Sequence, residues 1–335
     1  MTFDLSVVWA LVILIGVAVY IVADGFDLGV GILLPFVKQE AIQDEFIDSI
    51  SPVWDGNETW LILGGAALMG AFPLAYAVIL EAFTFPIVVM LFALILRGVA
   101  FEFRVHSPVG HKRIWTIAFI VGSYLAALMQ GMMAGAFLEG FIIGTTAQGT
   151  HFFDGTDLDW ISPFSLLTGV GLMVMFAVIG VFWGAMKGND VLKNLLISFK
   201  KPMIFALIAV LVAILIAMLF SSKLMPLLTG LRLYLVIGSM IVIGLVLLML
   251  LRNTTSAGKG FMLTVFIMIC GMVGYTSLFF PYIIPPSITL EMASSAASSQ
   301  MFGLVGTLIM LPIIIFYLSW TYFVFRGKVV AGEGY

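Results

Sequence analysis

The chain has 335 residues, of which 62% are hydrophobic and only 10% are charged, and its formal net charge is −3. Apolar runs of roughly 18 residues or more recur along its length, which is typical of a polytopic membrane protein and excludes an ordinary water-soluble domain. Strand edges would leave backbone groups unpaired in lipid, so the runs predict helices and an all-α fold. The single cysteine, Cys270, excludes a disulfide framework within the chain.

The apolar runs predict nine transmembrane helices in one transmembrane domain that covers residues 1–335. The first and fourth runs are too long for a simple crossing, so we expect these helices to tilt, protrude or break. No basic residue precedes Lys38, so the first helix is expected to be retained rather than cleaved as a signal peptide. The predicted helices run near 6–37, 57–80, 82–103, 114–144, 160–186, 200–220, 228–251, 260–280 and 303–326.

Basic residues are distributed unevenly over the predicted loops. Of the 15 Lys and Arg residues, only Lys223 and Arg232 fall on one side, together with an acidic loop that contains Asp154, Asp157 and Asp159. Cytoplasmic loops are enriched in Lys and Arg. The N-terminus is therefore predicted to lie outside and the C-terminus in the cytoplasm, which agrees with an odd number of crossings.

Two carboxylates, Asp24 and Asp27, interrupt the first apolar run three residues apart, hence on one helix face. Gly25 and Gly29 are spaced so that a neighbouring helix can approach closely. Carboxylates in a membrane are costly and need a partner or a proton. Two interpretations stay open: a structural pair held by Arg97 or backbone donors, or a proton-handling pair.

The segment from Trp54 to Trp60 places Asp55, Asn57 and Glu58 at the start of the second predicted helix. Asp55 suits a helix N-cap, and it also suits a proton acceptor at the cytoplasmic entrance; the two roles are compatible. The tryptophans are expected to be interfacial belt residues.

Depths along the helices, at about 1.5 Å per residue, place Arg97 about as deep as Asp24 and Asp27. Unpaired buried ions cost several kcal/mol, so we predict that Arg97 contacts at least one of Asp24, Asp27 and Glu102. Asp55 is predicted to open toward the cytoplasmic side, close to any companion subunit.

The acidic run between the first two predicted helices is typical of a solvated amphipathic linker, although it could instead concentrate protons near an uptake mouth. It contains Glu40, Asp44, Glu45 and Asp48.

All three histidines, His106, His111 and His151, fall in predicted loops. Buried haem usually needs a histidine, cysteine, methionine or tyrosine ligand, so the chain alone is a poor candidate for redox chemistry.

Several motifs resemble subunit II of the cytochrome bd-type quinol oxidases. ADGFDLGVG at 23–31 and SPVWDGNETW at 51–60 match in order and spacing, and FPYIIP at 280–285 follows the eighth predicted helix. LRGVAFEFR at 96–104 matches the end of the family's third helix, in the form typical of its short, cyanide-insensitive branch. The resemblance covers essentially the whole chain.

The resemblance implies a subunit of a complex that oxidises quinol and reduces dioxygen to water in a bacterial or archaeal cytoplasmic membrane. Two b-type haems and one d-type haem would be bound by subunit I, the obligate partner, and no haem or metal by this chain. A small accessory subunit, membrane lipid and a structural quinone are possible further partners, whereas nucleic acid is not expected.

The resemblance also implies site residues, none of them catalytic in this chain. The pair Trp54 and Asp55 matches the family's proton route from the cytoplasm, and the carboxylates of the first helix are associated with it. The candidates for the proton pathway are Asp55, Trp54, Asp24, Asp27 and Glu58, and the candidates for structural charge partners are Arg97, Glu102 and Arg104.

Two other classes of function remain open from the residues alone. A proton-coupled secondary transporter would show similar helices but usually also repeated halves with paired broken helices, which are not evident here. A purely structural membrane subunit is the other alternative.

Overall fold

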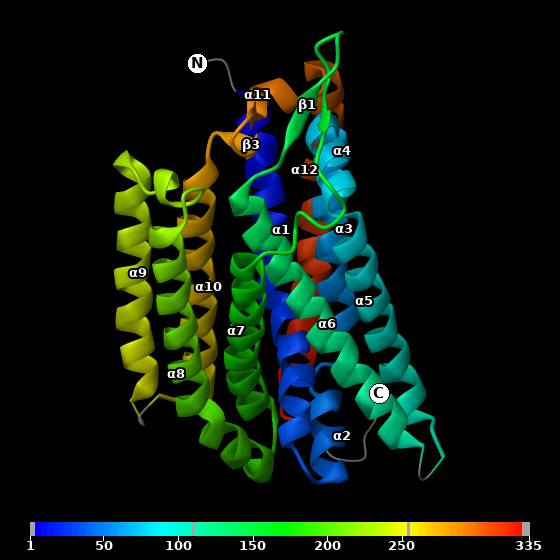
Figure 1. The fold of residues 1–335 in the computed structure, drawn as a ribbon. Coiled ribbons are helices and arrows are strands. Elements are labelled where there is room, and N and C mark those ends of the chain that lie inside the picture. Colours follow the sequence, from blue (N-terminus) through cyan, green and yellow to red (C-terminus); the bar gives the residue numbers. More distant parts are fainter. Residues whose placement is uncertain (1–3, 109–110, 253–254, 330–335) are drawn as a thin grey trace.

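Long helices that run along one common axis dominate the computed structural model, which describes residues 4–108, 111–252 and 255–329 (Figure 1). The longer helices are α1 (Leu5–Leu33), α3 (Trp54–Ala71), α4 (Pro73–Ala82), α5 (Thr84–Val105), α6 (Lys112–Glu139), α7 (Pro163–Lys187), α8 (Asp190–Phe220), α9 (Gly230–Leu251), α10 (Ala257–Phe279) and α12 (Ala297–Val324). The shorter elements are η1 (Leu34–Phe36), α2 (Glu40–Asp48), η2 (Met225–Leu227), α11 (Leu290–Ala293) and two antiparallel hairpins, β1 (Ile143–Thr145) with β2 (His151–Phe153) and β3 (Tyr282–Ile284) with β4 (Ile288–Thr289).

Eight of these helices are long and apolar enough to cross a membrane, among the described residues. The second predicted helix is the exception, because it is divided into α3 and α4 at Phe72, just before Pro73. Proline lacks an amide hydrogen and cannot continue the hydrogen-bond ladder. The backbone N–H of Ser295 donates to the Ala71 carbonyl oxygen at 2.9 Å, and its hydroxyl donates to that of Gly70 at 2.9 Å, so the break is capped from the segment before α12.

Three predicted boundaries are displaced. α12 begins at Ala297 rather than near 303, and the other two have a clear local reason. α6 ends at Glu139 rather than near 144, because Gly140 adopts a φ of +83° and the chain leaves the helix toward β1. α8 begins at Asp190 rather than near 200, because the side chain of Asn189 accepts hydrogen bonds from the N–H groups of Val191 and Leu192.

α1 and α7 form the centre of the bundle and approach each other closely. A Cβ atom added to Gly29 would lie 2.1 Å from the carbonyl oxygen of Phe176, and one added to Gly180 would lie 2.7 Å from the backbone of Gly29. A Cβ added to Gly25 would lie 2.7 Å from the Phe176 ring. The close approach expected from the glycine spacing is therefore confirmed, with α7 as the partner helix.

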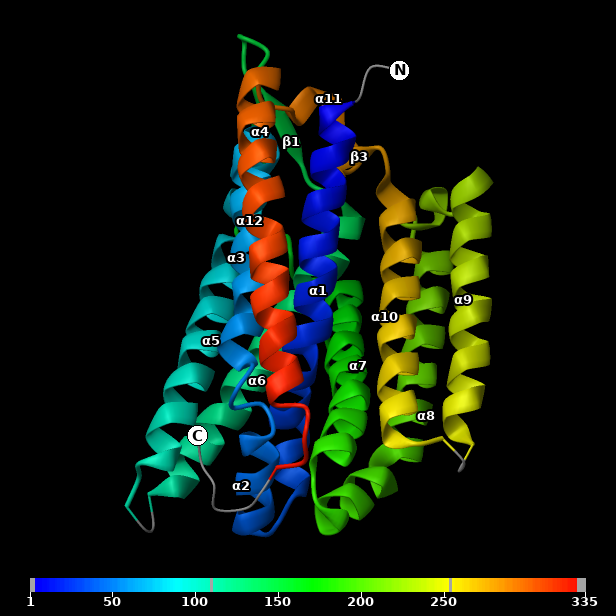
Figure 2. The ribbon, with the colours of Figure 1, turned by 180° about the vertical axis from the view of Figure 1, so that it is seen from behind.

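The remaining helices surround this pair unequally. α8, α9 and α10 lie to one side of α7, and α3, α4, α5 and α6 lie toward the other (Figures 1 and 2). α12 runs along the outside of α1 and α3, and Gln300 is its one buried residue among those described (Figure 2). The start of α1 and the end of α12 lie at opposite ends of the bundle (Figure 1).

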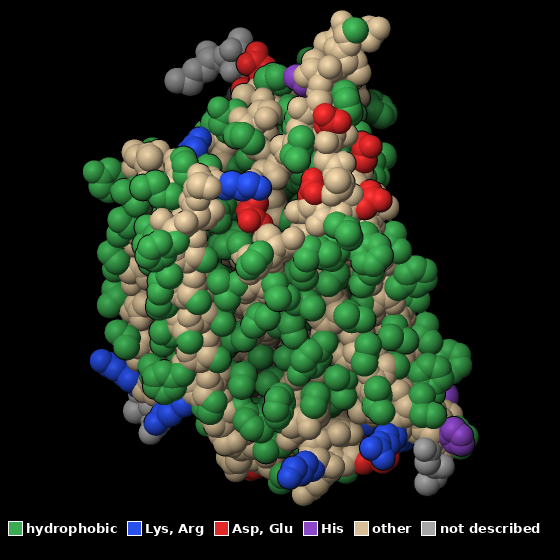
Figure 3. Space-filling view, in the orientation of Figure 1, with side chains coloured by type: hydrophobic (Ala, Val, Ile, Leu, Met, Phe, Trp, Pro, Cys, Tyr) green, Lys and Arg blue, Asp and Glu red, His purple; other side chains and the backbone are tan. Residues whose placement is uncertain are grey.

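Charged side chains gather at the two ends of the bundle, with hydrophobic side chains between them (Figure 3). Most Lys and Arg side chains on this face lie at the lower end, whereas the acidic ones lie mainly toward the upper end. This pattern follows the unequal division of basic residues among the predicted loops.

Candidate functional site

Asp55 lies in the first turn of α3 and is exposed. The N-cap interpretation is wrong, because the cap position is Val53 and it makes no side-chain cap hydrogen bond. A carboxylate in the first turn is still favourably placed, since the partial positive charge of the helix dipole lies there.

The two tryptophans that flank this segment pack within the protein. The ring of Trp54 lies 5.6 Å from that of Phe101 and contacts α5 at Gly98. Trp60 is 6% exposed, so the interpretation as a belt residue at the membrane surface is wrong for it. The sequence could not distinguish the two settings, because belt and buried tryptophans both flank polar segments.

A buried ion cluster joins α1, α3 and α5 about one turn beyond the start of α3. Nη1 of Arg97 on α5 lies 2.7 Å from Oδ1 of Asp24 on α1, and Nη2 of Arg97 also pairs with Oε1 of Glu58 on α3. Arg97 and Asp24 are fully buried, and Glu58 is a quarter exposed. The predicted contact between Arg97 and a carboxylate of the first helix is thus confirmed.

The partnership between Arg97 and Glu58 was not predicted, since Glu58 was assigned to the proton pathway alone. Conversely, Glu102 is exposed and makes no ion pair with any residue that the structure describes. The two positions differ because Arg97 points between α1 and α3, whereas Glu102 lies on the outer face of α5.

Asp27 is fully buried one turn further along α1, with a different partner. Nδ2 of Asn57 donates a hydrogen bond to its Oδ2 at 2.8 Å. The hydroxyl of Tyr322 on α12 donates to Oδ1 of the same asparagine at 2.7 Å. Sequence reasoning missed both residues as part of the site. The sequence could have indicated Asn57, because it is a polar residue three positions after Trp54. Nothing in the sequence distinguished Tyr322 from the other aromatic residues of α12.

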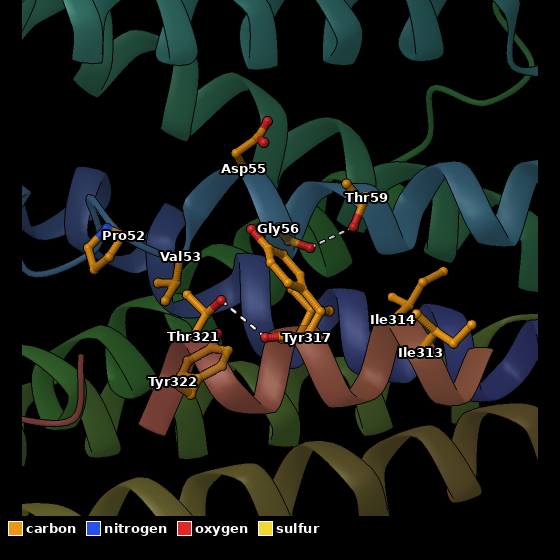
Figure 4. A pocket seen from close by; sticks show the side chains of 11 residues that line it. Pro52, Val53, Asp55, Gly56, Thr59, Ile313, Ile314, Tyr317, Thr321 and Tyr322 are labelled. Atoms are coloured by element: carbon orange, nitrogen blue, oxygen red, sulfur yellow. Dashed lines mark hydrogen bonds between the residues drawn. The ribbon is translucent and has the colours of Figure 1, made fainter. Parts of the chain in front are cut away.

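A groove of about 510 Å³ lies between the first turns of α3 and the second half of α12 (Figure 4). In this view the Asp55 carboxylate points away from α12, whereas the ring of Tyr317 reaches from α12 toward Gly56. Thr59 and Tyr322 also line the groove, so polar groups lead from the surface toward the buried Asn57.

A second set of charges lies at the end of the bundle where α2 is found. Arg104 is buried, its Nη1 lies 2.5 Å from Oδ1 of Asp44, and its Nε donates to the hydroxyl of Thr116 at 2.9 Å. Nζ of Lys112 lies 3.2 Å from Oδ2 of Asp44. Arg104 thus pairs with a carboxylate of the acidic run.

The description of the acidic run as a solvated linker is therefore wrong in part. The run folds into α2, and Glu45 is buried and accepts a hydrogen bond from the backbone N–H of Asn189. Burial, followed by the charge of Asp44, raises the pKa of the half-buried Asp48 carboxyl. Through these contacts the run joins α5, α6 and the start of α8 at this end of the bundle.

No group of three or more His, Cys, Asp and Glu residues is arranged to hold a metal ion within residues 4–108, 111–252 and 255–329. The site is instead a set of carboxylates, one guanidinium and neutral hydrogen-bonding groups. Such a set can hold and move protons.

Comparison with known proteins shows which family combines this fold with these motifs. The profile of the family described as cytochrome bd terminal oxidase subunit II matches residues 5–325. The chain belongs to this family. With eight apolar helices of spanning length in the part of the chain that the structure describes, it is a multi-pass protein of the bacterial cytoplasmic membrane.

Individual members of the cytochrome bd subunit II family are similar to different extents. The chain is 35% identical over 191 residues to a "Probable cytochrome oxidase subunit 2" of Haemophilus influenzae and 32% identical over 170 residues to the "Cytochrome bd-I ubiquinol oxidase subunit 2" of Escherichia coli K12. These matches cover 56% and 50% of this chain but only 50% and 44% of those relatives, so the chain spans about half of their length.

Two further matches extend over the whole chain. The "Cytochrome bd ubiquinol oxidase subunit 2" of Bacillus subtilis is 25% identical over 333 residues, which is 96% of each chain. A chain in the structure of bd oxidase from Geobacillus thermodenitrificans superposes with a TM-score of 0.74 at 18% identity, over 96% of this chain and 99% of that chain. The latter match shows the shared fold.

Proposed function

We propose that this chain is subunit II of a bd-type quinol oxidase, a complex that reduces dioxygen to water with electrons from quinol. The observation that carries the proposal is the family match over residues 5–325. It is supported by the subunit 2 of Bacillus subtilis, which aligns along 96% of its length. The chain itself would hold no reacting atoms. Its work would be to stabilise the haem-bearing subunit I and to help deliver protons from the cytoplasm.

The topology that goes with this function has nine crossings, with α3 and α4 together as the second. The N-terminus would lie outside and the C-terminus in the cytoplasm. The charge division supports this orientation, because the end with α2, the α7–α8 connection and the end of α12 carries most of the basic residues. Asp55 then opens at the cytoplasmic side.

The companion subunit would supply the two b-type haems and the d-type haem. The donor set of this chain supports that division, because the described histidines His106, His111 and His151 lie outside the apolar helices and the carboxylates of the site are engaged with Arg97 and Asn57.

Subunit I is proposed to dock on the face formed by α3, α5 and α12. This face exposes Asp55 and Thr59 beside large apolar side chains such as Phe92 and Phe316. Lipid tails cannot satisfy a carboxylate, whereas a protein partner with bound water can. Asp55 would thereby lie next to the haem-bearing chain.

Proton delivery follows from the chemistry of the complex. Reducing dioxygen to water consumes protons at a buried site, and a lone charge cannot cross the low-dielectric interior without a relay. Asp55 would accept a proton from the cytoplasm, and the carboxylates Glu58, Asp24 and Asp27 lie further in. Arg97 stabilises the ionised members of this set, so that negative charge can persist inside the membrane.

Purification of the chain with its partners tests the proposal directly. A difference spectrum of reduced minus oxidised protein should show b-type and d-type haem bands. A preparation without the d-type band would weaken the assignment, and one without any haem would refute it. The chain expressed alone should be unstable or aggregated; a monodisperse folded monomer in mild detergent would contradict an obligate partner.

Substitution of Asp55 separates proton delivery from a purely structural role. Asp55→Asn should lower the quinol-dependent rate of oxygen consumption while the haem spectrum stays normal. Loss of the haem bands would instead favour a scaffold function. Asp190→Asn is a matched control, since Asp190 is also an exposed aspartate in the first turn of a helix at the same end.

A further inference from the structure

The carboxyl group of Asp27 is the most isolated of the buried acids. Its Oδ2 accepts one hydrogen bond from Asn57, and its Oδ1 is buried without a hydrogen-bond partner among the described residues. The side chain is 0% exposed. An ionised carboxylate in such a position would lack the two or three donors that usually stabilise it.

The charges around Asp27 do not compensate an ionised carboxylate. Arg97 on α5 is the cation of the cluster, and it is already shared between Asp24 on α1 and Glu58 on α3. The structure gives Asp27 no ion pair with any described cation. The other titratable groups that face the cluster are neutral phenols, Tyr20 on α1 and Tyr322 on α12. A third negative charge beside one guanidinium would be costly, whereas a neutral carboxylic acid would not.

Asn57, the hydrogen-bond donor to Asp27, is oriented by Tyr322, which lines the groove between α3 and α12. Because the Tyr322 hydroxyl donates to Oδ1 of Asn57 at 2.7 Å, the amide NH₂ must point the other way. It donates to Asp27 at 2.8 Å and lies 3.4 Å from the carbonyl oxygen of Ala23. Asn57 is 1% exposed, so this orientation has no competition from solvent.

We propose that Asp27 carries a proton in the resting protein, and that Asn57 and Tyr322 are positioning residues that hold this acid at the inner end of the groove between α3 and α12. An amide does not pass a proton on, so Asn57 orients the acid and does not conduct. The purpose of the stored proton rests on the proposed function; its presence does not.

Infrared spectroscopy of the purified protein with its bound subunits tests the proposal without turnover. A protonated carboxylic acid absorbs in a carbonyl-stretch region where carboxylates do not. The spectrum of the wild type minus that of Asp27→Asn at neutral pH should show a positive acid band. Asp24→Asn should leave that band in place, because the Asp24 carboxyl group pairs with Arg97 and not with Asp27. Absence of the band from the Asp27→Asn difference spectrum would overturn the proposal.

The positioning role has its own readout. Tyr322→Phe and Asn57→Leu should each shift the frequency of the Asp27 band, with the larger shift for Asn57→Leu, because that variant removes the hydrogen bond to the acid. A band that stays at the wild-type frequency in both variants would refute the positioning role. Thr321→Val is a matched control on α12, since the hydroxyl of Thr321 donates to the Tyr317 carbonyl oxygen at 3.1 Å and to no other described residue.

Melting temperatures of the variants show whether they are folded and give a second test of the protonation of Asp27. Asparagine is a neutral isostere of protonated aspartate, so Asp27→Asn should melt within a few degrees of the wild type, whereas Asp24→Asn should lose more. The reverse order would contradict a neutral Asp27. Failure of Asp55→Asn to slow turnover would refute proton delivery through that residue and leave the infrared result standing.

Discussion

The two sides of the bundle consist of similarly apolar helices but differ in what they bury. On one side, α1, α3 and α5 enclose Asp24, Asp27, Asn57 and Arg97 in their interior. On the other, Lys200 is the one buried charge of the described parts of α8, α9 and α10, and its Nζ donates to the carbonyl oxygen of Arg252 at 3.0 Å near the end of the bundle.

The difference suggests separate roles for apolar packing, which assembles the bundle, and for the buried charges, which are proposed to serve the chemistry of the complex. The α8–α10 side shows that apolar packing with a terminal lysine suffices to assemble long helices. Buried ion pairs are weak evidence of stabilisation, because desolvation offsets much of their attraction. The contrast supports the proposal that the cluster of α1, α3 and α5 serves proton delivery rather than folding.

Removal of Arg97 is expected to have the largest effect on stability. Arg97→Met leaves Asp24 and Glu58 without a cation and should cost about 3–5 kcal/mol, the usual consequence of breaking a buried pair. Lys200→Met on the other side removes one hydrogen bond to a carbonyl oxygen and should cost about 1 kcal/mol. Thermal unfolding of the purified complex measures both, and equal losses would remove the contrast between the two sides.

The centre of the bundle should tolerate less added volume than its margin. Gly29→Ala places a methyl group against the Phe176 carbonyl oxygen and should cost about 1–3 kcal/mol through overpacking of α1 on α7. Gly238→Ala on α9 is the matched control, because a Cβ there would meet nothing within 4 Å. Melting temperatures of the two variants should therefore differ clearly; similar values would show that α1 and α7 are less tightly packed than the structure indicates.

Asp48 on α2 should give the smallest effect, with a distinct pH dependence. Its pKa is raised by burial and by Asp44, so ionisation weakens the folded state, and stability is gained as the pH falls through the raised pKa. Asp48→Asn should thus stabilise the protein at neutral pH by at most about 0.5 kcal/mol, since the group is partly exposed, and the gain should vanish in acid.

The pH dependence has an internal control at the opposite end of the bundle. Hydrogen bonds from Thr156 lower the pKa of Asp159, so its ionised form favours the fold, and this stability is lost as the pH falls through the lowered pKa. Asp159→Asn should therefore destabilise the protein at neutral pH. Denaturation followed across a pH series should give opposite signs for the two variants, and equal signs would contradict the assigned causes.

Most of the fold was predictable from hydrophobicity, since runs of spanning length leave few alternatives to helices. The depth of Arg97 and of Asp24 on their helices also sufficed to predict their contact. The break at Phe72 was harder to predict from the sequence. The carbonyl oxygens that it frees accept hydrogen bonds from Ser295, which is far away in the sequence. Such long-range partners leave no local signal.

The charged residues of the site were predictable from the sequence, whereas the neutral residues that hydrogen-bond to them were not. Asp24, Asp27 and Glu58 stood out because ionisable residues are rare in apolar runs. Tyr322 did not, since one tyrosine among the aromatic residues of α12 is ordinary, and its importance comes from the packing of α12 against α3. The residue Glu102 shows the converse: a charge near the right depth that points outward.

Protons for oxygen reduction are proposed to enter through the charged side of the bundle, beginning at Asp55. The most direct measurement mixes the fully reduced complex rapidly with oxygen and follows proton uptake with a pH-indicator dye beside the optical signals of the haems. Asp55→Asn should slow proton uptake, whereas the control Asp190→Asn should not. Wild-type uptake in Asp55→Asn, in a complex with normal haem spectra, would contradict this proposal.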